Sequence, residues 1–338
     1  MGKKYKNLFD QITDIKNLRS AYNKACNGGN RYTDGHLRFK ESLESNLYHI
    51  QRQLIDGTYS HGPHTHFYVY EPKKRLISAL QFRDRVVQHA INTVIEPIFD
   101  RTFYANNFAC RKNKGTHAGV KAVQSTVRRL AKEGEVYYLK MDFSKYFASI
   151  DRGILYQEVD RKISDKRLML LLESFGDRTG IGVPIGNLLS QLFANMYGHI
   201  FDRHIKEQLG VKHYFRYMDD TVILSHDKEW LRNIQQHLED YASIKMKLSL
   251  SHWMIDKVQT KPINFLGYRI TAGYKLIRKD SVTRAKRKIK RYSSKGDSEK
   301  LSAFMASWGG HIRSADCQNL KHTLQETFNG KHEHCAAA

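Results

Sequence analysis

An α+β fold is predicted from three patterns in the sequence. Apolar residues recur at helical spacing through long segments near both ends of the chain and between them. Short runs of β-strand composition occur in pairs that are joined by turn residues. Because 41% of the 338 residues are hydrophobic, the chain can also bury a sizeable core, divided among two or three subdomains.

The N-terminal third is expected to combine helices with one hairpin. Helical spacing runs from Leu8 to about Leu54 and is interrupted by a Gly- and Asn-rich loop between Asn27 and Gly35. Two β-like runs within residues 67–80 flank the turn sequence Glu-Pro-Lys-Lys, so the tip and return strand of this hairpin carry Lys73, Lys74 and Arg75. Helical spacing then resumes at Phe82 and continues up to Pro97.

The central third alternates buried strands with helices. A buried strand is expected from Val136 to Met141, with Asp142 at its end and a turn and helix after it. A Gly- and Pro-rich loop then opens a long apolar helix within residues 180–205. Two further strands, His213 to Tyr217 and Thr221 to Leu224, place Met218-Asp219-Asp220 at a hairpin tip.

The last third turns from mixed composition to basic composition. An amphipathic helix is expected from Lys228 to Tyr241, followed by a strand near "LSLSHWMI" and a second hairpin from Ile263 to Ile270. Between Lys275 and Arg291 almost every charged residue is Lys or Arg, and Asp280 is the one acid. We expect a small, basic, helical subdomain there.

Charge and cysteine usage narrow the class of protein. Lys and Arg outnumber Asp and Glu by 56 to 34, which gives a formal net charge of +22. This excess predicts an anionic partner, and nucleic acid is the first candidate. The four cysteines are far apart and form no zinc-ribbon or disulfide pattern, so a reducing cytoplasm is expected. Since no apolar run is long enough to span a bilayer, no membrane association is expected.

Three carboxylates, Asp142, Asp219 and Asp220, come at the ends of buried strands. Like charges held together on rigid backbone repel unless a cation lies between them. A pair of Mg²⁺ ions would satisfy this need and would support two-metal phosphoryl transfer. Taken alone, two adjacent acids in a turn are as compatible with a solvated surface turn as with a catalytic site. Their strand flanks, Asp142, the basic hairpin and the net charge together favour catalysis.

The order of motifs resembles that of reverse transcriptases: "RLISALQFRDRVVQHA", "KMDFSKYFASID", "GVPIGNLLSQLFANMYG", "YMDD" and "INFLGY", from about Tyr70 to Ile270. Within that family, "IGNLLSQ", "LSLSHW" and the short basic C-terminal region are similar to enzymes of diversity-generating retroelements from bacteria and phages. The resemblance implies a right-hand polymerase fold. The N-terminal region and fingers would occupy residues 1–135, the palm residues 136–274, with residues 160–195 joining the fingers, and a helical thumb residues 275–338.

The resemblance also implies roles for individual residues. Asp142, Asp219, Asp220 and the carbonyl of Phe143 match the metal site. Arg75 would bind the triphosphate of the incoming dNTP, because its guanidinium suits phosphate oxygens, and Lys73 and Lys74 are weaker candidates for the same role. Gln191 would lie in the same nucleotide-binding region. Phe147 matches the aromatic ring that excludes nucleotides with a 2′-hydroxyl. Tyr268 matches a primer-grip hairpin, although core packing explains it equally well. The residues expected to grip the template–primer backbone are Arg284, Lys286, Arg287, Lys288, Lys290 and Arg291.

Ile185 departs from the Gln that most family members carry before the following Gly. An aliphatic side chain cannot hydrogen-bond there, so we expect the nascent base pair to be less restrained. In the retroelement group this accompanies errors at template adenines. The implied partners are the template-repeat RNA and its cDNA, dNTPs and a multimeric, basic accessory variability protein, in the cytoplasm of a bacterial or phage-infected cell. A retron or group II intron enzyme and a non-catalytic RNA-binding scaffold are the alternatives.

Overall fold

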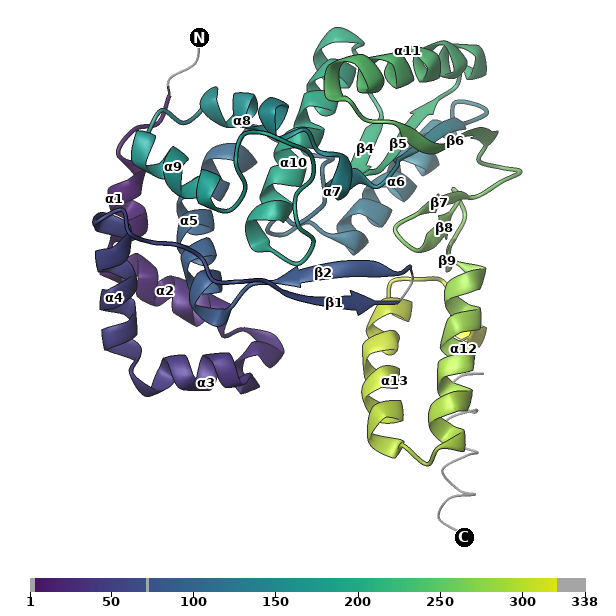
Figure 1. Ribbon diagram of the computed structural model, residues 1–338. Coiled ribbons are helices and arrows are strands. Elements are labelled where there is room, and N and C mark those ends of the chain that lie inside the picture. The colour runs from purple at the N-terminus through teal and green to yellow at the C-terminus, as the bar shows by residue number, and fades with distance from the viewer. Residues whose placement is uncertain (1–3, 71–72, 321–338) are drawn as a thin grey trace. The chain divides into compact units, whose positions relative to one another are not determined.

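The computed structural model describes residues 4–70 and 73–320 of the 338 (Figure 1). The chain divides into two compact units, and it passes repeatedly from one to the other. Unit 1 comprises residues 1–105, 143–210 and 238–251, and unit 2 comprises residues 106–142, 211–237 and 252–338. The C-terminal part of the expected thumb, residues 321–338, lies outside the described residues.

Four helices form the N-terminal part of unit 1: α1 (Leu8–Thr13), α2 (Ile15–Ala25), α3 (Asp34–Glu41) and α4 (Leu43–Ile55). The predicted loop is confirmed around a 3₁₀ turn at Gly28–Tyr32. The helical segment before it is divided, because the Asp14 carboxylate accepts the backbone N–H of Lys16 at 2.7 Å and starts a new helix.

α5 (Phe82–Asp100) is the long helix against which α1, α2 and α10 (Leu188–Arg203) pack. It continues past Pro97, where the apolar spacing was expected to end. A proline in the last turn interrupts the hydrogen-bond ladder only at its end, so the helix tolerates it there. The remaining helices of unit 1 include α7 (Tyr146–Ser149), α8 (Arg152–Asp160) and α9 (Lys166–Ser174).

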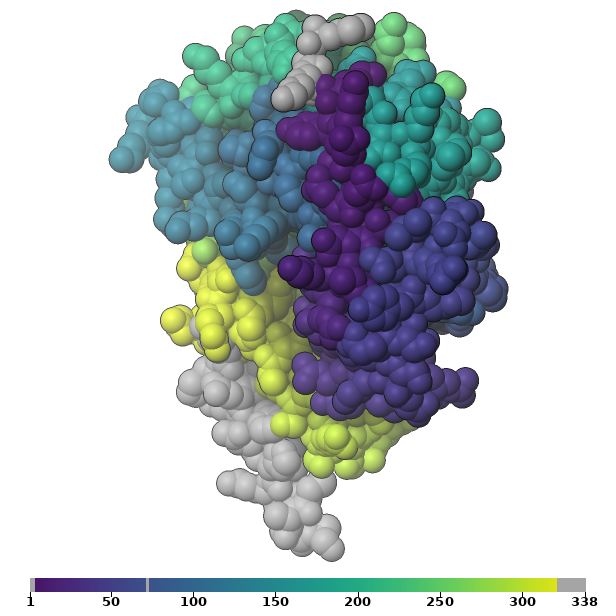
Figure 2. Space-filling view, turned by 90° about the vertical axis from the view of Figure 1, so that its left-hand side faces the viewer, coloured from purple at the N-terminus to yellow at the C-terminus, as the bar shows by residue number. Residues whose placement is uncertain are grey.

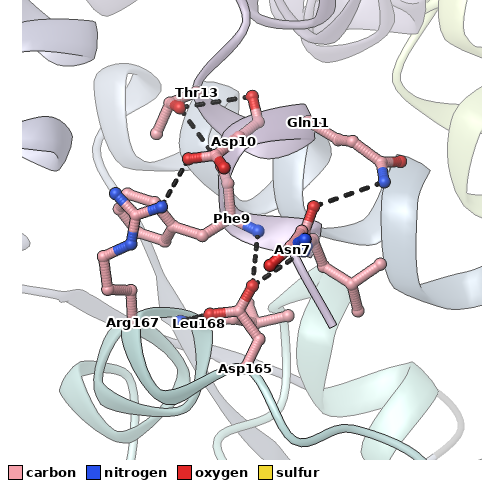
Figure 3. A network of polar contacts seen from close by, with 9 residues as sticks. Asn7, Phe9, Asp10, Gln11, Thr13, Asp165, Arg167 and Leu168 are labelled. Carbon is pink, nitrogen blue, oxygen red and sulfur yellow. Dashed lines mark hydrogen bonds and ion pairs between the residues drawn. The ribbon is translucent and has the colours of Figure 1, made fainter. Parts of the chain in front are cut away.

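One carboxylate joins the N-terminal segment to α9 (Figure 3). Asp165 Oδ2 accepts the backbone N–H groups of Leu8 and Phe9 at 2.7 and 2.9 Å, and its other oxygen accepts that of Leu168 at 3.2 Å. Burial raises the pKa of Asp165, but these three N–H donors outweigh burial and the net pKa is lowered. The N-terminal segment accordingly lies along the surface beside the teal α8–α9 region in Figure 2.

The first predicted hairpin is confirmed in unit 1. β1 (Thr65–Val69) pairs antiparallel with β2 (Arg75–Ala79), with Thr65 opposite Ala79 and Val69 opposite Arg75. Residues 71–72 at its tip lie outside the described residues.

Unit 2 is built on a sheet of order β4-β5-β3-β6 (Figure 1). Its strands are β3 (Tyr137–Phe143), β4 (Tyr214–Tyr217), β5 (Asp220–Ser225) and β6 (Leu250–Lys257), and β5 runs antiparallel to both β3 and β4. α6 (Thr116–Leu130) contributes Val120, Val123 and Val127 to the same buried cluster as Phe215 and Val222. α11 (Lys228–Met246) confirms the predicted amphipathic helix and extends it by more than a turn.

The second predicted hairpin is confirmed as β7 (Ile263–Phe265) and β8 (Tyr268–Ile270), and a third strand, β9 (Lys275–Ile277), adds to it. The expected small, basic, helical subdomain thus begins with a short strand, which the sequence did not indicate. Pairing with β8 buries Ile277, and that tertiary contact outweighs the basic composition.

The helices of the basic segment are α12 (Lys279–Ser294) and α13 (Ser298–Ile312), which pack together. α12 turns Ala285 and Ile289 inward. Within residues 4–70 and 73–320, no helix has both the length and the apolar character needed to cross a bilayer.

Candidate active site

The turn that carries the two adjacent acids is shorter than the sequence predicts. β5 begins at Asp220, so only Met218 and Asp219 lie between the strands, and Tyr217 pairs with Asp220. Met218 has a φ of 53°, a left-handed conformation that is uncommon outside glycine. The fully buried Arg216 donates from Nη1 to the Met218 carbonyl at 3.2 Å, which holds this turn.

Asp142 and Asp219 bring two carboxylates together. Asp142 on β3 lies directly opposite Asp220 on β5, so the acids of both segments meet at one end of the sheet. Burial raises the pKa of Asp219 to about 6, and the negative charge of Asp142 contributes to the rise. Two carboxylates this close favour a shared proton or a cation between them.

Asp220 has different partners. Its Oδ1 lies 2.6 Å from Nζ of Lys140, and the two side chains are 23% and 14% exposed. Burial raises the pKa of Asp220, while the Lys140 ammonium and the backbone N–H of Leu266 oppose that rise. Asp220 therefore ties β5 to β3 and to the β7–β8 turn.

Sequence reasoning missed Lys140 and Arg216. Each interrupts an otherwise apolar β-run, in "YYLKMDF" and in "YFRY". Because long charged side chains are seldom fully buried without partners, that interruption was the available signal.

The donor set fits a divalent cation. Carboxylate oxygens of Asp142 and Asp219, with the backbone carbonyl of Phe143 next in the chain, are hard ligands of the kind Mg²⁺ prefers. Within residues 4–70 and 73–320, no three His, Cys, Asp or Glu side chains are arranged as a metal cluster, and Asp220 is engaged by Lys140. The fit of this site to a divalent cation thus rests on the side chains of Asp142 and Asp219 and on the carbonyl of Phe143.

The candidate nucleotide residues lie in unit 1, where one loop joins three elements. The Ile185 carbonyl accepts the Ser78 N–H of β2 at 2.8 Å, and the Phe147 carbonyl accepts the Val183 N–H at 2.8 Å. Gly186 has a φ of 111°, and a Cβ there would lie 2.7 Å from Ile77 Cγ2. The loop that carries Ile185 is therefore docked on β2 and on α7 through its backbone.

The other predicted nucleotide residues differ in exposure. Arg75 begins β2 and is exposed, as are Lys73, Lys74 and Gln191, whereas Phe147 and Ile185 are partly buried. Sequence reasoning missed Gln88 on α5, which is 2% exposed. Its Oε1 accepts the Leu188 N–H at 3.1 Å and so caps α10, because the helix's own N-cap residue, Asn187, makes no side-chain capping bond.

Tyr268 is fully buried, as the core-packing alternative predicts. Its hydroxyl donates to the His311 carbonyl at 2.9 Å and lies 3.3 Å from Nδ1 of His117. The side chain thus connects the β7–β8 hairpin to α13 and α6.

α12 divides its basic residues into two groups. Lys286, Arg287, Lys290 and Arg291 make no ion pair with a described acid, and all four are exposed at the helix surface. Arg284 pairs with Asp280 at 3.3 Å, and Lys288 lies over the Phe304 ring. The first four are exposed and therefore available to a partner, and the Arg291 guanidinium also lies 5.8 Å from the ring centroid of its neighbour Tyr292.

Residues 69–270 match the reverse transcriptase (RNA-dependent DNA polymerase) family, which covers more than half of the chain. The chain belongs to the reverse transcriptase family. It is an RNA-directed DNA polymerase by family, and reverse transcriptase domains act on RNA templates and dNTPs with divalent metal ions. Family membership favours the enzyme over the alternative of a non-catalytic scaffold.

Curated relatives of this reverse transcriptase are distant. Protein YkfC of Escherichia coli is 25% identical over 269 residues, 65% of this chain and 70% of that protein. The group II intron-encoded protein LtrA of Lactococcus lactis is 25% identical over 175 residues, 48% of this chain and 28% of that protein. The putative COX1/OXI3 intron 1 protein of Saccharomyces cerevisiae is 23% identical over 61% of this chain and 26% of that protein. The chain therefore spans less than a third of LtrA.

The right-hand polymerase fold is supported by a solved structure. Apo telomerase from Candida tropicalis, truncated from its C-terminal domain, matches 67% of this chain and 59% of its own with a TM-score of 0.50 and 11% identity. At that identity the likeness concerns the fold alone.

Proposed function

We propose that this reverse transcriptase copies the template-repeat RNA of a diversity-generating retroelement into cDNA that carries errors at template adenines, for transfer into a target gene. The observation that carries the proposal is Ile185. Its loop is docked on β2 through the backbone hydrogen bond from Ser78 N–H to the Ile185 carbonyl, and its side chain is aliphatic. A hydrogen-bonding amide at this place would restrain the nascent base pair, whereas an isoleucine has no polar atom to do so.

The chemistry proposed for the carboxylates is phosphoryl transfer. Asp142, Asp219 and the Phe143 carbonyl would hold two Mg²⁺ ions, which supply a lowered pKa for the primer hydroxyl and neutralise charge on the phosphate. Asp220, through Lys140 and the Leu266 N–H, keeps the turn that presents Asp219 in place.

The nucleotide and primer residues have supporting parts in the proposal. Arg75, assisted by Lys73 and Lys74, would pair with the triphosphate, while Gln191 would lie near the nucleotide. Phe147 would exclude a 2′-hydroxyl. The basic face of α12 would contact the template–primer backbone. Tyr268 would support the primer grip by holding the β7–β8 hairpin in position, since its own side chain is buried.

The proposed setting is the cytoplasm of a bacterial or phage-infected cell, with a multimeric, basic accessory variability protein as partner. Two basic proteins repel each other unless an anion lies between them. Template RNA would serve as that anion, so we expect the complex to form only with RNA present.

A second candidate is a group II intron-type reverse transcriptase, which would copy its template faithfully. The similarity to the group II intron-encoded protein LtrA favours it. A retron-type enzyme would likewise be expected to make faithful cDNA. The error spectrum of the product separates these candidates from the proposal.

The test is primer extension with Mg²⁺ and dNTPs on an RNA template that contains all four bases, followed by sequencing of the cDNA. Wild type is expected to misincorporate mainly opposite adenine. Ile185→Gln is expected to reduce those errors, while Ile185→Leu, a matched aliphatic control, retains them. Asp219→Ala is expected to make no cDNA. Faithful wild-type cDNA would replace the proposal with the group II intron or retron candidate.

A further inference from the structure

One side chain of α9 is exposed in the middle of an apolar run. Residues 168–172 read Leu-Met-Leu-Leu-Leu. Leu168, Met169, Leu171 and Leu172 are between 0 and 7% exposed, whereas Leu170 is 68% exposed. Single exposed leucines are common on proteins, so the surroundings of Leu170 decide whether it marks a binding surface.

Leu170 lies between two hollows in the surface of unit 1. The first has a volume of about 170 Å³, and α1, α4 and α9 contribute to its lining. Its apolar side chains are Phe9, Leu54, Ile55, Tyr59, Leu170 and Leu171. Ile55 is itself 54% exposed. The first hollow is therefore an apolar recess with two large aliphatic side chains open to solvent.

The second hollow is larger and more polar. It has a volume of about 540 Å³, and Leu170, Met169 and Ile163 line it together with charged side chains. We call Leu170 and the two hollows the α9 groove. An apolar surface that continues from one hollow to the next suits a partner with more than one apolar side chain.

Most charges around the α9 groove are already neutralised. Arg178 lies 2.6 Å from Asp160 and also pairs with Glu173. Arg167 pairs with Asp10, and its guanidinium carbon lies 4.6 Å from the centroid of the Phe9 ring (Figure 3). These acids and arginines therefore satisfy one another and leave no strong charge for a partner.

Two lysines beside the second hollow differ from these pairs. Lys4 and Lys166 both line it and are exposed, and within residues 4–70 and 73–320 neither forms an ion pair. Lys4 is placed by its neighbour Tyr5, which donates its N–H to the Lys162 carbonyl at 2.7 Å and accepts the Ser164 N–H at 3.0 Å. The uncompensated charge beside the α9 groove is therefore positive.

From these features we infer that the α9 groove docks an acidic amphipathic helix of another protein. Apolar side chains on one face of that helix enter the two hollows and cover Leu170. Asp and Glu side chains beside its apolar face pair with Lys4 and Lys166. The inference does not rest on the proposed function, because it involves neither the cDNA nor its errors.

Two other classes of partner fit the α9 groove poorly. Nucleic acid needs cations for its phosphates and flat rings for its bases, whereas Arg167 and Arg178 are engaged by acids and Leu170 is aliphatic. A basic protein, such as the proposed accessory protein, would be repelled by Lys4 and Lys166. An acidic helix matches both the apolar recess and the charge beside it.

The experiment begins with a phage-displayed library of peptides of about 16 residues, long enough to form a helix. The library is selected on the full-length protein and depleted on Leu170→Ser, whose substituted side chain is exposed, so that the protein still folds and extends a primer like wild type. Enriched peptides are expected to be rich in Asp and Glu, with apolar residues at helical spacing.

Fluorescence anisotropy then measures the affinity of the most enriched peptide. Leu170→Ser is expected to weaken binding at least about tenfold, which corresponds to about 1.4 kcal/mol and is within the value of burying one leucine side chain. Lys4→Gln combined with Lys166→Gln is expected to weaken binding and reduce its salt dependence. Leu37→Ser changes a leucine on α3 that is 48% exposed, and this control is expected to bind like wild type.

Several results would overturn the inference. Selection that enriches no peptide, or only basic peptides, would do so, as would equal weakening by Leu37→Ser. Weaker binding of a short single-stranded RNA by Leu170→Ser would identify a nucleic-acid surface instead. Self-association of wild type that Leu170→Ser abolishes, measured by light scattering, would make a second copy of the chain the occupant. Faithful cDNA would reject the retroelement proposal and leave this inference untouched.

Discussion

Asp219 and Asp220 are adjacent in the chain and have different surroundings. Asp219 faces Asp142 and has a raised pKa, whereas Asp220 is held by Lys140 and the Leu266 N–H. The pattern "YMDD" places two acids side by side and carries no information on the partners that each one has in the fold. The distinction comes from residues 80 positions apart, Lys140 and Asp220, which the strand pairing brings together.

Replacing these acids one at a time should reveal the difference. Asp142→Asn and Asp219→Asn remove charged oxygen ligands, and we expect each to slow primer extension about 10³-fold or more. Asp220→Asn keeps an oxygen for the Leu266 N–H, and we expect a smaller effect, roughly 10- to 100-fold. Single-turnover extension rates measure this, with circular dichroism as the check on folding. Equal effects for all three would contradict the assigned roles.

His89 on α5 makes stability depend on pH. Burial, followed by the charges of Arg85 and Lys24, lowers its pKa to about 4. The unfolded chain takes up this proton near its ordinary pKa of about 6.5, while the folded chain stays neutral until about pH 4. The contribution of neutral His89 is therefore complete above about pH 6.5 and is lost as the pH falls towards 4.

Urea unfolding of His89→Gln should show a flatter decline in stability from about pH 7 to about pH 5 than wild type does. The difference is expected to be on the order of 1 kcal/mol after allowance for solvent screening. His252→Gln, at an exposed histidine, serves as the control and should decline like wild type. Parallel curves for wild type and His89→Gln would reject the role of this histidine.

Among the elements, the loop before α10 shows what local patterns miss. Its glycines predict a loop and the apolar run predicts the helix, and both are confirmed. The side chain that caps the helix is Gln88, 100 positions away from Leu188. The strand β9 was missed for a related reason, since its three residues become a strand by pairing with β8.

Gln88→Leu should destabilise the protein by about 1–2 kcal/mol, because a buried helix N–H loses its acceptor. It should also change the error spectrum of the cDNA, since Ile185 lies in the loop that this cap holds. Gln88→Glu keeps acceptor oxygens at the helix N-terminus and should be less destabilising. Thermal unfolding and cDNA sequencing give the two readouts. An unchanged error spectrum in a folded Gln88→Leu protein would limit Gln88 to a structural role.

At the scale of the whole molecule, the charge of +22 predicts an anionic partner. The structure distinguishes which cations of α12 are available to such a partner and which are engaged within the helix pair. Sequence composition treats the basic residues of α12 alike, because it contains no information on which side of the helix packs.

Changing Lys286, Arg287, Lys290 and Arg291 together to Gln should weaken binding of a template–primer duplex and make it less dependent on salt. The slope of log K against log salt concentration is expected to fall by up to about 3–4, close to one for each phosphate that is no longer neutralised. Changing Lys16, Arg38 and Lys40, which lie on α2 and α3, is the control. A similar fall in that control would show that the charge acts without regard to position.

The sequence by itself determined the N-terminal helices, the helices α5, α10 and α11, the two hairpins, the order of motifs and, through that order, the family. It did not indicate α6, α8 or α9. The elements that it determined follow from periodicity and turn chemistry, which depend on residues close together in the chain. Only the tertiary structure decided the pairing of Lys140 with Asp220, the burial of Arg216 beneath the Met218 turn and the cap from Gln88 on α10. Those interactions join residues through the way the strands and helices pack, and a pattern confined to neighbouring residues carries no information on that packing.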